Sequence, residues 1–139
     1  MPQFLLDTDH LTLYQRNHPI VVSRMTMYSK GTVALSVVSI EESLRGRLAA
    51  LARARDGAAR IFLYNLLLTT LDVFSQLPLI SWDQASEAEF QRLRGIRLRV
   101  GTQDLKIASI ALANNLTLLT RNRVDFSRIP VLKIADWSV

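Results

Sequence analysis

The chain of 139 residues contains no cysteine, which excludes disulfide bonds, thiolate zinc sites and cysteine nucleophiles. Histidine is almost as scarce, because only His10 and His18 are present. A metal-free ribonuclease would need a pair of catalytic histidines. We interpret both histidines as residues of turns or of the surface, so the sequence disfavours histidine-based cleavage.

Long apolar runs are also missing. No stretch of about 18 apolar residues is free of charge, so the sequence predicts no membrane span. The most apolar segment, residues 61–71, is too short and contains Asn65 and two threonines. The N-terminus lacks the basic segment and the cleavage site of a secretion signal. These absences together predict a cytoplasmic protein.

Glycine and proline are few and scattered, with five and four residues, and they mark no linker. No internal repeat or low-complexity tract interrupts the chain. A hydrophobic content of 49% with 21% charged residues is typical of a globular protein. The sequence therefore predicts one domain over residues 1–139.

Strand-like and helix-like segments alternate along the chain. Strands are expected at residues 3–6, 32–36, 79–82, 116–120 and 131–134. Helices are expected at residues 9–17, from about 20 to 29, and at 43–55, 58–77, 83–99 and 103–115. The alternation predicts an α/β fold in three layers, with a central, mainly parallel sheet of four or five strands and helices on both faces.

Four carboxylates stand where an apolar run ends or a helix begins: Asp7, Glu42, Asp104 and Asp125. Side chains at the carboxyl ends of parallel strands converge on one crevice, so these acids can be distant in sequence and close in space. Clustered acids repel one another unless a cation holds them, and oxygen ligands favour Mg²⁺ or Mn²⁺. The pattern indicates a metal-dependent enzyme that acts on phosphate.

Each acid also has a structural interpretation. Asp7 could cap a helix, but Asp9 would serve equally well, which leaves Asp7 free for chemistry. Glu42 follows Ser39 by three residues, as in a capping box, and for this acid the structural and functional interpretations are equally supported. The dipole of a helix start could account for Asp104. One shared metal site explains all of them together.

Four segments carry a resemblance to a known family: FLLDTDHLTLY, LSVVSIEESLRG, VGTQDLKIASIALANNLTLLTRN and DFSRI. Together they span nearly the whole chain, which resembles a PIN domain of the kind found as the toxin in bacterial VapBC toxin–antitoxin pairs. The resemblance assigns the first acid to Asp7, the central glutamate to Glu42 rather than Glu41, and the third acid to Asp104.

Two positions depart from the family's pattern. The fourth acid falls on Asn122, so Asp125 is expected to contribute in its place, and Thr120 resembles a hydroxyl that orients the site. Asp9 stands where similar toxins commonly have asparagine, and it adds a carboxylate in the outer shell.

The resemblance implies a PIN-like endoribonuclease that hydrolyses RNA with metal-activated water. Asp7, Glu42 and Asp104 would hold Mg²⁺, with Mn²⁺ as a possible substitute. It also implies a small cognate antitoxin, seated in an apolar groove between residues 9–28 and the helix at 58–77, and a homodimer. We interpret most apolar residues of these segments as core packing.

The charge balance agrees with a nucleic-acid partner, since 17 basic and 12 acidic residues leave a net charge of +5. Arg45 lies nearest the expected site, together with Arg121 or Arg123. Two other functions remain open. The DTD of residues 7–9 is similar to the nucleophile motif of haloacid dehalogenase-like phosphatases, although the later motifs of that family are absent. A PIN-like binding module without cleavage is the other, and Asn122 is its only support.

Overall fold

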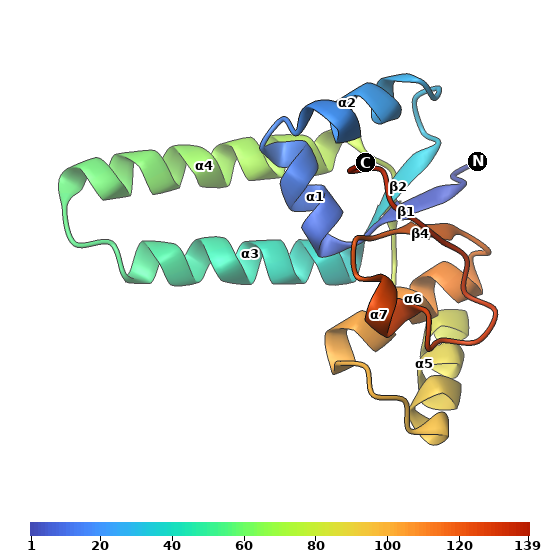
Figure 1. Ribbon diagram of the computed structural model, residues 1–139. Helices are drawn as coiled ribbons and strands as arrows, with labels where there is room; N and C mark the ends of the chain where they lie inside the picture. Colours follow the sequence, from blue (N-terminus) through green and yellow to red (C-terminus); the bar gives the residue numbers. More distant parts are fainter.

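The computed structural model describes residues 1–139 and has a central sheet with helices on both of its faces (Figure 1). The strands are β1 (Phe4–Leu6), β2 (Val33–Ser36), β3 (Leu79–Ile80), β4 (Thr117–Leu119) and β5 (Ile134–Ala135). The helices are α1 (Thr8–Gln15), α2 (Pro19–Thr26), α3 (Val37–Ala52), α4 (Gly57–Gln76), α5 (Gln84–Ile96), α6 (Thr102–Ala113) and α7 (Arg123–Phe126).

The strands lie in the order β3-β2-β1-β4-β5, and every pair is parallel. From the central strand β1 the chain builds one side of the sheet with β2 and β3, and it then returns past β1 to build the other side with β4 and β5. The order of the strands therefore reverses between β1 and β4, and ligands of α/β sheets bind in the crevice at such a point. The predicted α/β fold is confirmed, with a sheet that is parallel throughout.

Successive side chains of each short strand point to opposite faces of the sheet, so the hydrophobic core has one part on each face. Leu5, Ala34 and Leu118 belong to a cluster with buried residues of α5, α6 and α7. The next residue of each strand, Leu6, Leu35 and Leu119, belongs to a cluster with Leu11 of α1 and Phe74 near the end of α4. Each of these fully buried leucines contributes about 2 kcal/mol of hydrophobic stabilisation.

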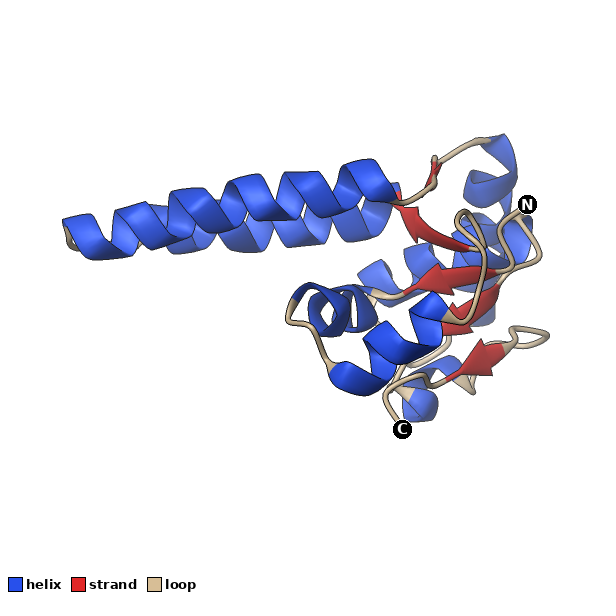
Figure 2. Cartoon of the chain, turned by 90° about the horizontal axis from the view of Figure 1, so that it is seen from above, coloured by secondary structure: helices blue, strands red, loops and turns tan.

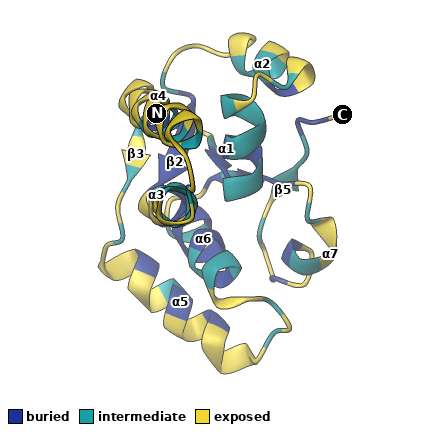
Figure 3. Ribbon diagram, turned by 90° about the vertical axis from the view of Figure 1, so that its left-hand side faces the viewer, coloured by how far each residue is buried: buried dark blue, intermediate teal, exposed yellow.

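Helices α3 and α4 form an antiparallel hairpin that projects beyond the sheet (Figures 1 and 2). The Nε of Arg47 on α3 donates a hydrogen bond of 3.0 Å to Oγ1 of Thr70 on α4, which ties the two helices together. Only Thr70 and Phe74 of α4 are buried, and most of the helix is exposed in Figure 3. The interpretation of its apolar residues as core packing is therefore wrong. The exposed apolar side chains are Ile61, Phe62, Tyr64, Leu68 and Leu71.

The same helix corrects the expectation about membranes. With 20 residues and a mean hydropathy of 1.2, α4 is long and apolar enough by length and composition alone to cross a bilayer. The apolar segment at residues 61–71 is only the middle part of this helix. However, α4 carries Arg60 and Asp72 and is bonded to α3, which bears several charges. A helix with this setting is better suited to a protein interface than to lipid.

Several predicted elements differ in detail. The helix expected at 83–99 ends at Ile96, and it buries Ser86, Phe90 and Leu93 while Ala85 and Ala88 are exposed. The fifth strand begins at Ile134 rather than at residue 131. Val131 has a φ of 70°, which is incompatible with an extended strand and rare for a β-branched residue.

Candidate active site

Asp7 lies directly after β1, at the carboxyl edge of the central strand, and only 6% of its surface is exposed. Its backbone N–H donates to the carbonyl of Leu119 on β4, so the residue is fixed at the point where the strand order reverses. Its Oδ1 accepts a hydrogen bond of 2.7 Å from the backbone N–H of His10, which makes Asp7 the N-cap of α1. The expectation that Asp9 would cap this helix is wrong.

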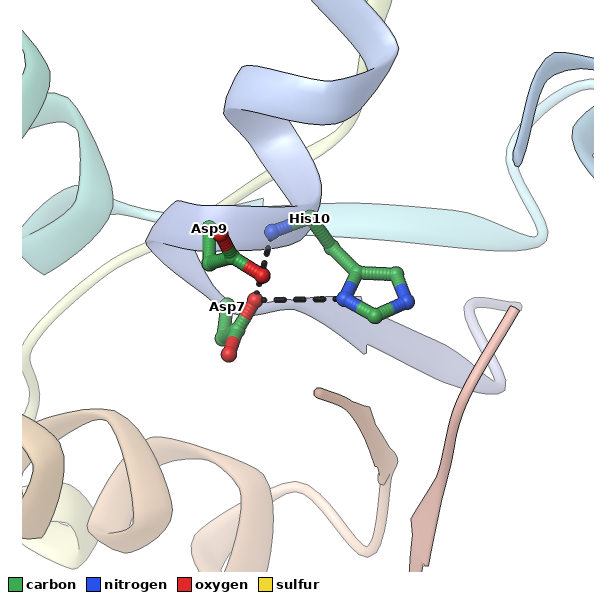
Figure 4. Close-up of side chains that lie close together, drawn as sticks. All are labelled: Asp7, Asp9 and His10. Carbon is green, nitrogen blue, oxygen red and sulfur yellow. Dashed lines mark hydrogen bonds and ion pairs between the residues drawn. The ribbon is translucent and has the colours of Figure 1, made fainter. Parts of the chain in front are cut away.

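Capping occupies only one carboxylate oxygen of Asp7. Figure 4 shows that the other oxygen points away from the His10 ring. Asp7 is therefore both a structural cap and a carboxylate with one oxygen free for a ligand.

Glu42 lies in the second turn of α3 and is half-buried. The predicted capping box is wrong, because Ser36 is the N-cap of α3 and accepts a hydrogen bond from the backbone N–H of Ser39. The Oε1 of Glu42 instead accepts a bond of 2.6 Å from the hydroxyl of Thr8. With its capping role removed, Glu42 is held beside the residue that follows Asp7.

Asp104 lies in the first turn of α6, and the N-cap of that helix, Gly101, provides no side-chain bond. Burial, followed by the negative charges of Glu42, Asp7 and Asp125, raises the pKa of Asp104 to about 6. Carboxylates raise one another's pKa only when they are close and poorly screened by water. The fold thus brings acids from four separate segments into one field of negative charge.

Thr120, Asn122 and Asp125 form a second, linked group after β4. The Oγ1 of the fully buried Thr120 accepts a bond of 2.9 Å from the backbone N–H of Asn122. Asn122 caps α7, and its Nδ2 donates 3.0 Å to Oδ2 of Asp125. The Nη1 of Arg128 lies 3.2 Å from Oδ1 of Asp125. Asn122 and Asp125 therefore form one hydrogen-bonded pair rather than two alternative ligands.

Asp9, expected in the outer shell, makes a two-pronged ion pair with Arg121, and both N···O distances are 2.7 Å. The guanidinium of Arg121 lowers the pKa of Asp9, against the opposing effect of burial. The pair links the first turn of α1 to the loop after β4. Arg121, one of the expected phosphate contacts, thus already has an acidic partner.

The other two arginines expected near the site differ in whether an acidic partner neutralises them. Arg45 pairs with Glu41 at 2.6 Å on α3, whereas Arg123 is exposed and makes no salt bridge. Of the three arginines expected near the site, Arg123 is the cation that remains unneutralised.

The acids fit a divalent cation by the chemistry of their donors. The oxygens of Asp7, Glu42 and Asp104 are hard ligands of the kind that Mg²⁺ and Mn²⁺ prefer. Burial and then the charges of Glu42, Asp7 and Asp125 raise the pKa of Asp104, and a bound cation would offset the repulsion among these acids. A tighter group of potential ligands is formed by Asp7, Asp9 and His10, whose ligand atoms all lie within 4.8 Å of one another (Figure 4). The site could therefore hold a metal ion.

The largest cavity, of about 550 Å³, does not contain this constellation. It lies between α3, α5 and α6 and is lined by Trp82, Phe90 and Lys106 among others. The acids are arranged along an open edge of the sheet rather than in a deep cavity.

Three residues near the acids are not predicted as site residues by the sequence. The hydroxyl of Thr8 donates to Glu42 at 2.6 Å and lies 3.1 Å from the hydroxyl of the fully buried Ser39. His10 is completely buried, so its interpretation as a turn or surface residue is wrong, whereas His18 caps α2 as a turn residue. A sequence signal for His10 exists, since it lies next to Leu11 on the buried face of α1.

No family model matches the chain. The tRNA(fMet)-specific endonuclease VapC of Salmonella typhimurium is 25% identical over 99% of both chains. The ribonuclease VapC2 of Rickettsia felis is 26% identical over 96% of this chain and 97% of the relative.

The solved structures that are similar to this chain include VapBC complexes. A structure of DNA-bound VapBC from Salmonella typhimurium has a TM-score of 0.80 at 23% identity and covers 99% of both chains. The chain is VapC-like, with a PIN fold. A structure of VapBC2 from Rickettsia felis bound to a promoter DNA fragment has a TM-score of 0.76 at 27% identity, covering 96% of this VapC-like chain and 98% of the other.

Proposed function

We propose that this chain is a metal-dependent endoribonuclease and the toxin of a toxin–antitoxin pair. The observation that carries the proposal is the convergence of Asp7, Glu42 and Asp104, where burial and then the charges of neighbouring acids raise the pKa of Asp104 to about 6. The similarity to relatives named as endonuclease and ribonuclease over almost the full chain supports it.

Asp7, Glu42 and Asp104 are the proposed metal ligands. When bound, Mg²⁺ or Mn²⁺ would activate water for attack on phosphorus and offset charge on the leaving oxygen. We place the ligand position at the free oxygen of Asp7 rather than within the Asp7, Asp9 and His10 group, because both oxygens of Asp9 are engaged by Arg121.

The remaining residues hold this arrangement. Thr8 fixes one oxygen of Glu42, and Thr120 orients the turn that carries Asn122 and Asp125. Asp125, whose charge contributes to the raised pKa of Asp104, is the proposed replacement for the usual fourth acid. Arg123 provides a positive charge for RNA phosphate.

A small antitoxin is the proposed partner, since the similar solved structures are VapBC complexes. The expected groove has a counterpart in a pocket of about 300 Å³, lined by α2 residues such as Val22 and Met25 and by Gln76 and Leu77 at the end of α4. The exposed apolar side chains of α4 would be covered by the antitoxin or in a homodimer. We also propose a cytoplasmic location, because RNA is the proposed substrate.

The decisive test is cleavage of RNA with and without EDTA, followed by restoration with Mg²⁺ or Mn²⁺. We expect cleavage that stops with chelator and returns with either ion. Cleavage that ignores chelator would refute the metal mechanism. Metal binding without cleavage of any RNA would favour a PIN-like binding module, which is the second candidate because Asn122 replaces the usual fourth acid.

A further inference from the structure

His10 is a fully buried imidazole whose two nitrogens face different parts of the molecule. Its Nε2 accepts a hydrogen bond of 3.1 Å from the backbone N–H of Trp137. Its Nδ1 has no hydrogen-bond partner and lies 3.5 Å from Oδ1 of Asp7. A buried polar atom without a partner is costly, so its position beside a carboxylate calls for an explanation.

The bond to Trp137 determines where the proton of His10 lies. A nitrogen that accepts an N–H cannot carry a proton itself, so Nε2 is bare and the ring is neutral with its proton on Nδ1. The Nδ1–H therefore faces Asp7. The backbone N–H of His10 approaches the same oxygen of Asp7 at 2.7 Å. The backbone N–H is hydrogen-bonded to Oδ1, and Nδ1 lies 3.5 Å from the same atom.

The C-terminal segment holds the ring in this orientation. Trp137 is buried and stacks on Tyr28 with ring centroids 5.1 Å apart, and its ring also lies 4.8 Å from that of Phe4. Oδ1 of Asp136 lies 3.5 Å from Nε2 of His10, and it accepts hydrogen bonds from the backbone and the hydroxyl of Ser138, which stiffens the turn behind the imidazole. His10 is thus clamped between Asp7 and a packed aromatic cluster.

We propose that His10 is a positioning residue that turns Asp7 so that one carboxylate oxygen faces the metal. This inference rests on the proposed function and extends it to a supporting residue. The imidazole N–H attracts Oδ1, and the tail that carries Trp137 fixes the imidazole. An outer-shell histidine of this kind orients a ligating carboxylate and raises metal affinity without touching the ion.

The state of the ring can be tested without any substitution. The chain has only two histidines, so the ring nitrogens of ¹⁵N-labelled protein can be assigned by NMR, with His18 as an internal reference. We expect His10 to carry its proton on Nδ1 before and after addition of Mg²⁺. A proton on Nε2, or loss of the Nδ1 proton on addition of Mg²⁺, would overturn the proposal; the latter would show that His10 ligates the ion directly.

Two substitutions distinguish the role of Nδ1 of His10 from that of Nε2. Asparagine places an amide N–H near the position of Nδ1, whereas glutamine places an acceptor near that of Nε2 and lacks the donor toward Asp7. We expect His10→Gln to weaken Mn²⁺ binding about 10- to 100-fold and His10→Asn to stay within about threefold of the original chain. His18→Ala is the control and should leave Mn²⁺ affinity unchanged.

Calorimetric titration with Mn²⁺ measures these affinities, and urea unfolding in EDTA reports stability separately. A purely structural role would lower the free energy of unfolding but leave Mn²⁺ affinity equal in the folded His10→Gln and His10→Asn proteins, and that result would refute the proposal. If the unsubstituted chain binds no Mn²⁺, the proposed function itself fails. The two failures are therefore distinguishable.

Discussion

Asp104→Asn is the substitution whose effects follow most directly from the structure. The pKa of Asp104 is raised from 3.8 to about 6 by burial and by the charges of Glu42, Asp7 and Asp125. Without metal, the folded state therefore holds a proton on Asp104 more tightly than the unfolded chain does. The folded state binds more protons between about pH 4 and 6, so the stability contributed by this group falls as pH rises through that window.

The shift in the pKa of Asp104 also sets the size of its effect on the free energy of unfolding. A pKa that moves from 3.8 to about 6 corresponds to about 3 kcal/mol at full strength. Asp104 is only half-buried, and screening by water reduces this to about 1.5 kcal/mol. Asparagine has the same shape without the charge, so metal-free Asp104→Asn should be about 1.5 kcal/mol more stable above pH 7 and gain nothing near pH 4.

Urea unfolding in EDTA at pH 4, 6 and 8 measures these differences. Saturating Mg²⁺ should reverse the order at pH 8, because only the original chain keeps a full ligand set and is stabilised by binding, by about 2.7 kcal/mol at 100 times its Kd. Equal stabilities of the two proteins at pH 8 in EDTA would refute the crowding of acids around Asp104. RNA cleavage by the folded variant would remove Asp104 from the proposed site.

Three further predictions concern the same edge of the sheet. Asp7→Asn keeps a good N-cap and should change the free energy of unfolding by less than about 1 kcal/mol, while RNA cleavage falls to background; a rate close to that of the original chain would exclude Asp7 as a ligand. Asn122→Ala removes the cap of α7 and the bond to Asp125, so urea unfolding should show a loss of about 1 kcal/mol, with slower cleavage at saturating metal. An undiminished rate would mean that this pair is not needed. Arg123→Glu should reduce the salt slope of RNA binding by about 1, and an unchanged slope would exclude contact with phosphate.

The sequence was sufficient for the fold because the order of elements decides it. Apolar strands alternate with amphipathic helices, and this pattern leaves few topologies other than a parallel sheet covered on both faces. Element ends were less certain. The start of β5 depends on the left-handed backbone of Val131, which no apolar pattern reveals.

The candidate site was predicted in part. Strand ends indicate which acids can meet, and the raised pKa of Asp104 agrees with that meeting. The hydrogen-bond partners of these residues could not be predicted from the sequence. The bond from Thr8 to Glu42 spans 34 positions of the sequence, and the bond from Trp137 to His10 spans 127. Such contacts are created by tertiary packing and leave no local signature.

The exposed face of α4 was missed for a related reason. Apolar residues at helical spacing look the same whether they cover a sheet or project from it. The hairpin with α3 carries α4 beyond the reach of the sheet, and only Phe74 and Thr70 are buried.

Because β1 is the central strand, the part of the site at Asp7 should resist local unfolding more than the part at Asn122 and Asp125. Backbone amides of β1 and its neighbours are bonded in the middle of the sheet, so their exchange with deuterium requires unfolding of the whole domain. Asn122 and Asp125 instead depend on α7, a helix of four residues at the periphery. Local fraying there would displace Asn122 and Asp125 while Asp7 stays in place. The change from slowly to rapidly exchanging backbone amides should therefore fall between Leu119 and Phe126.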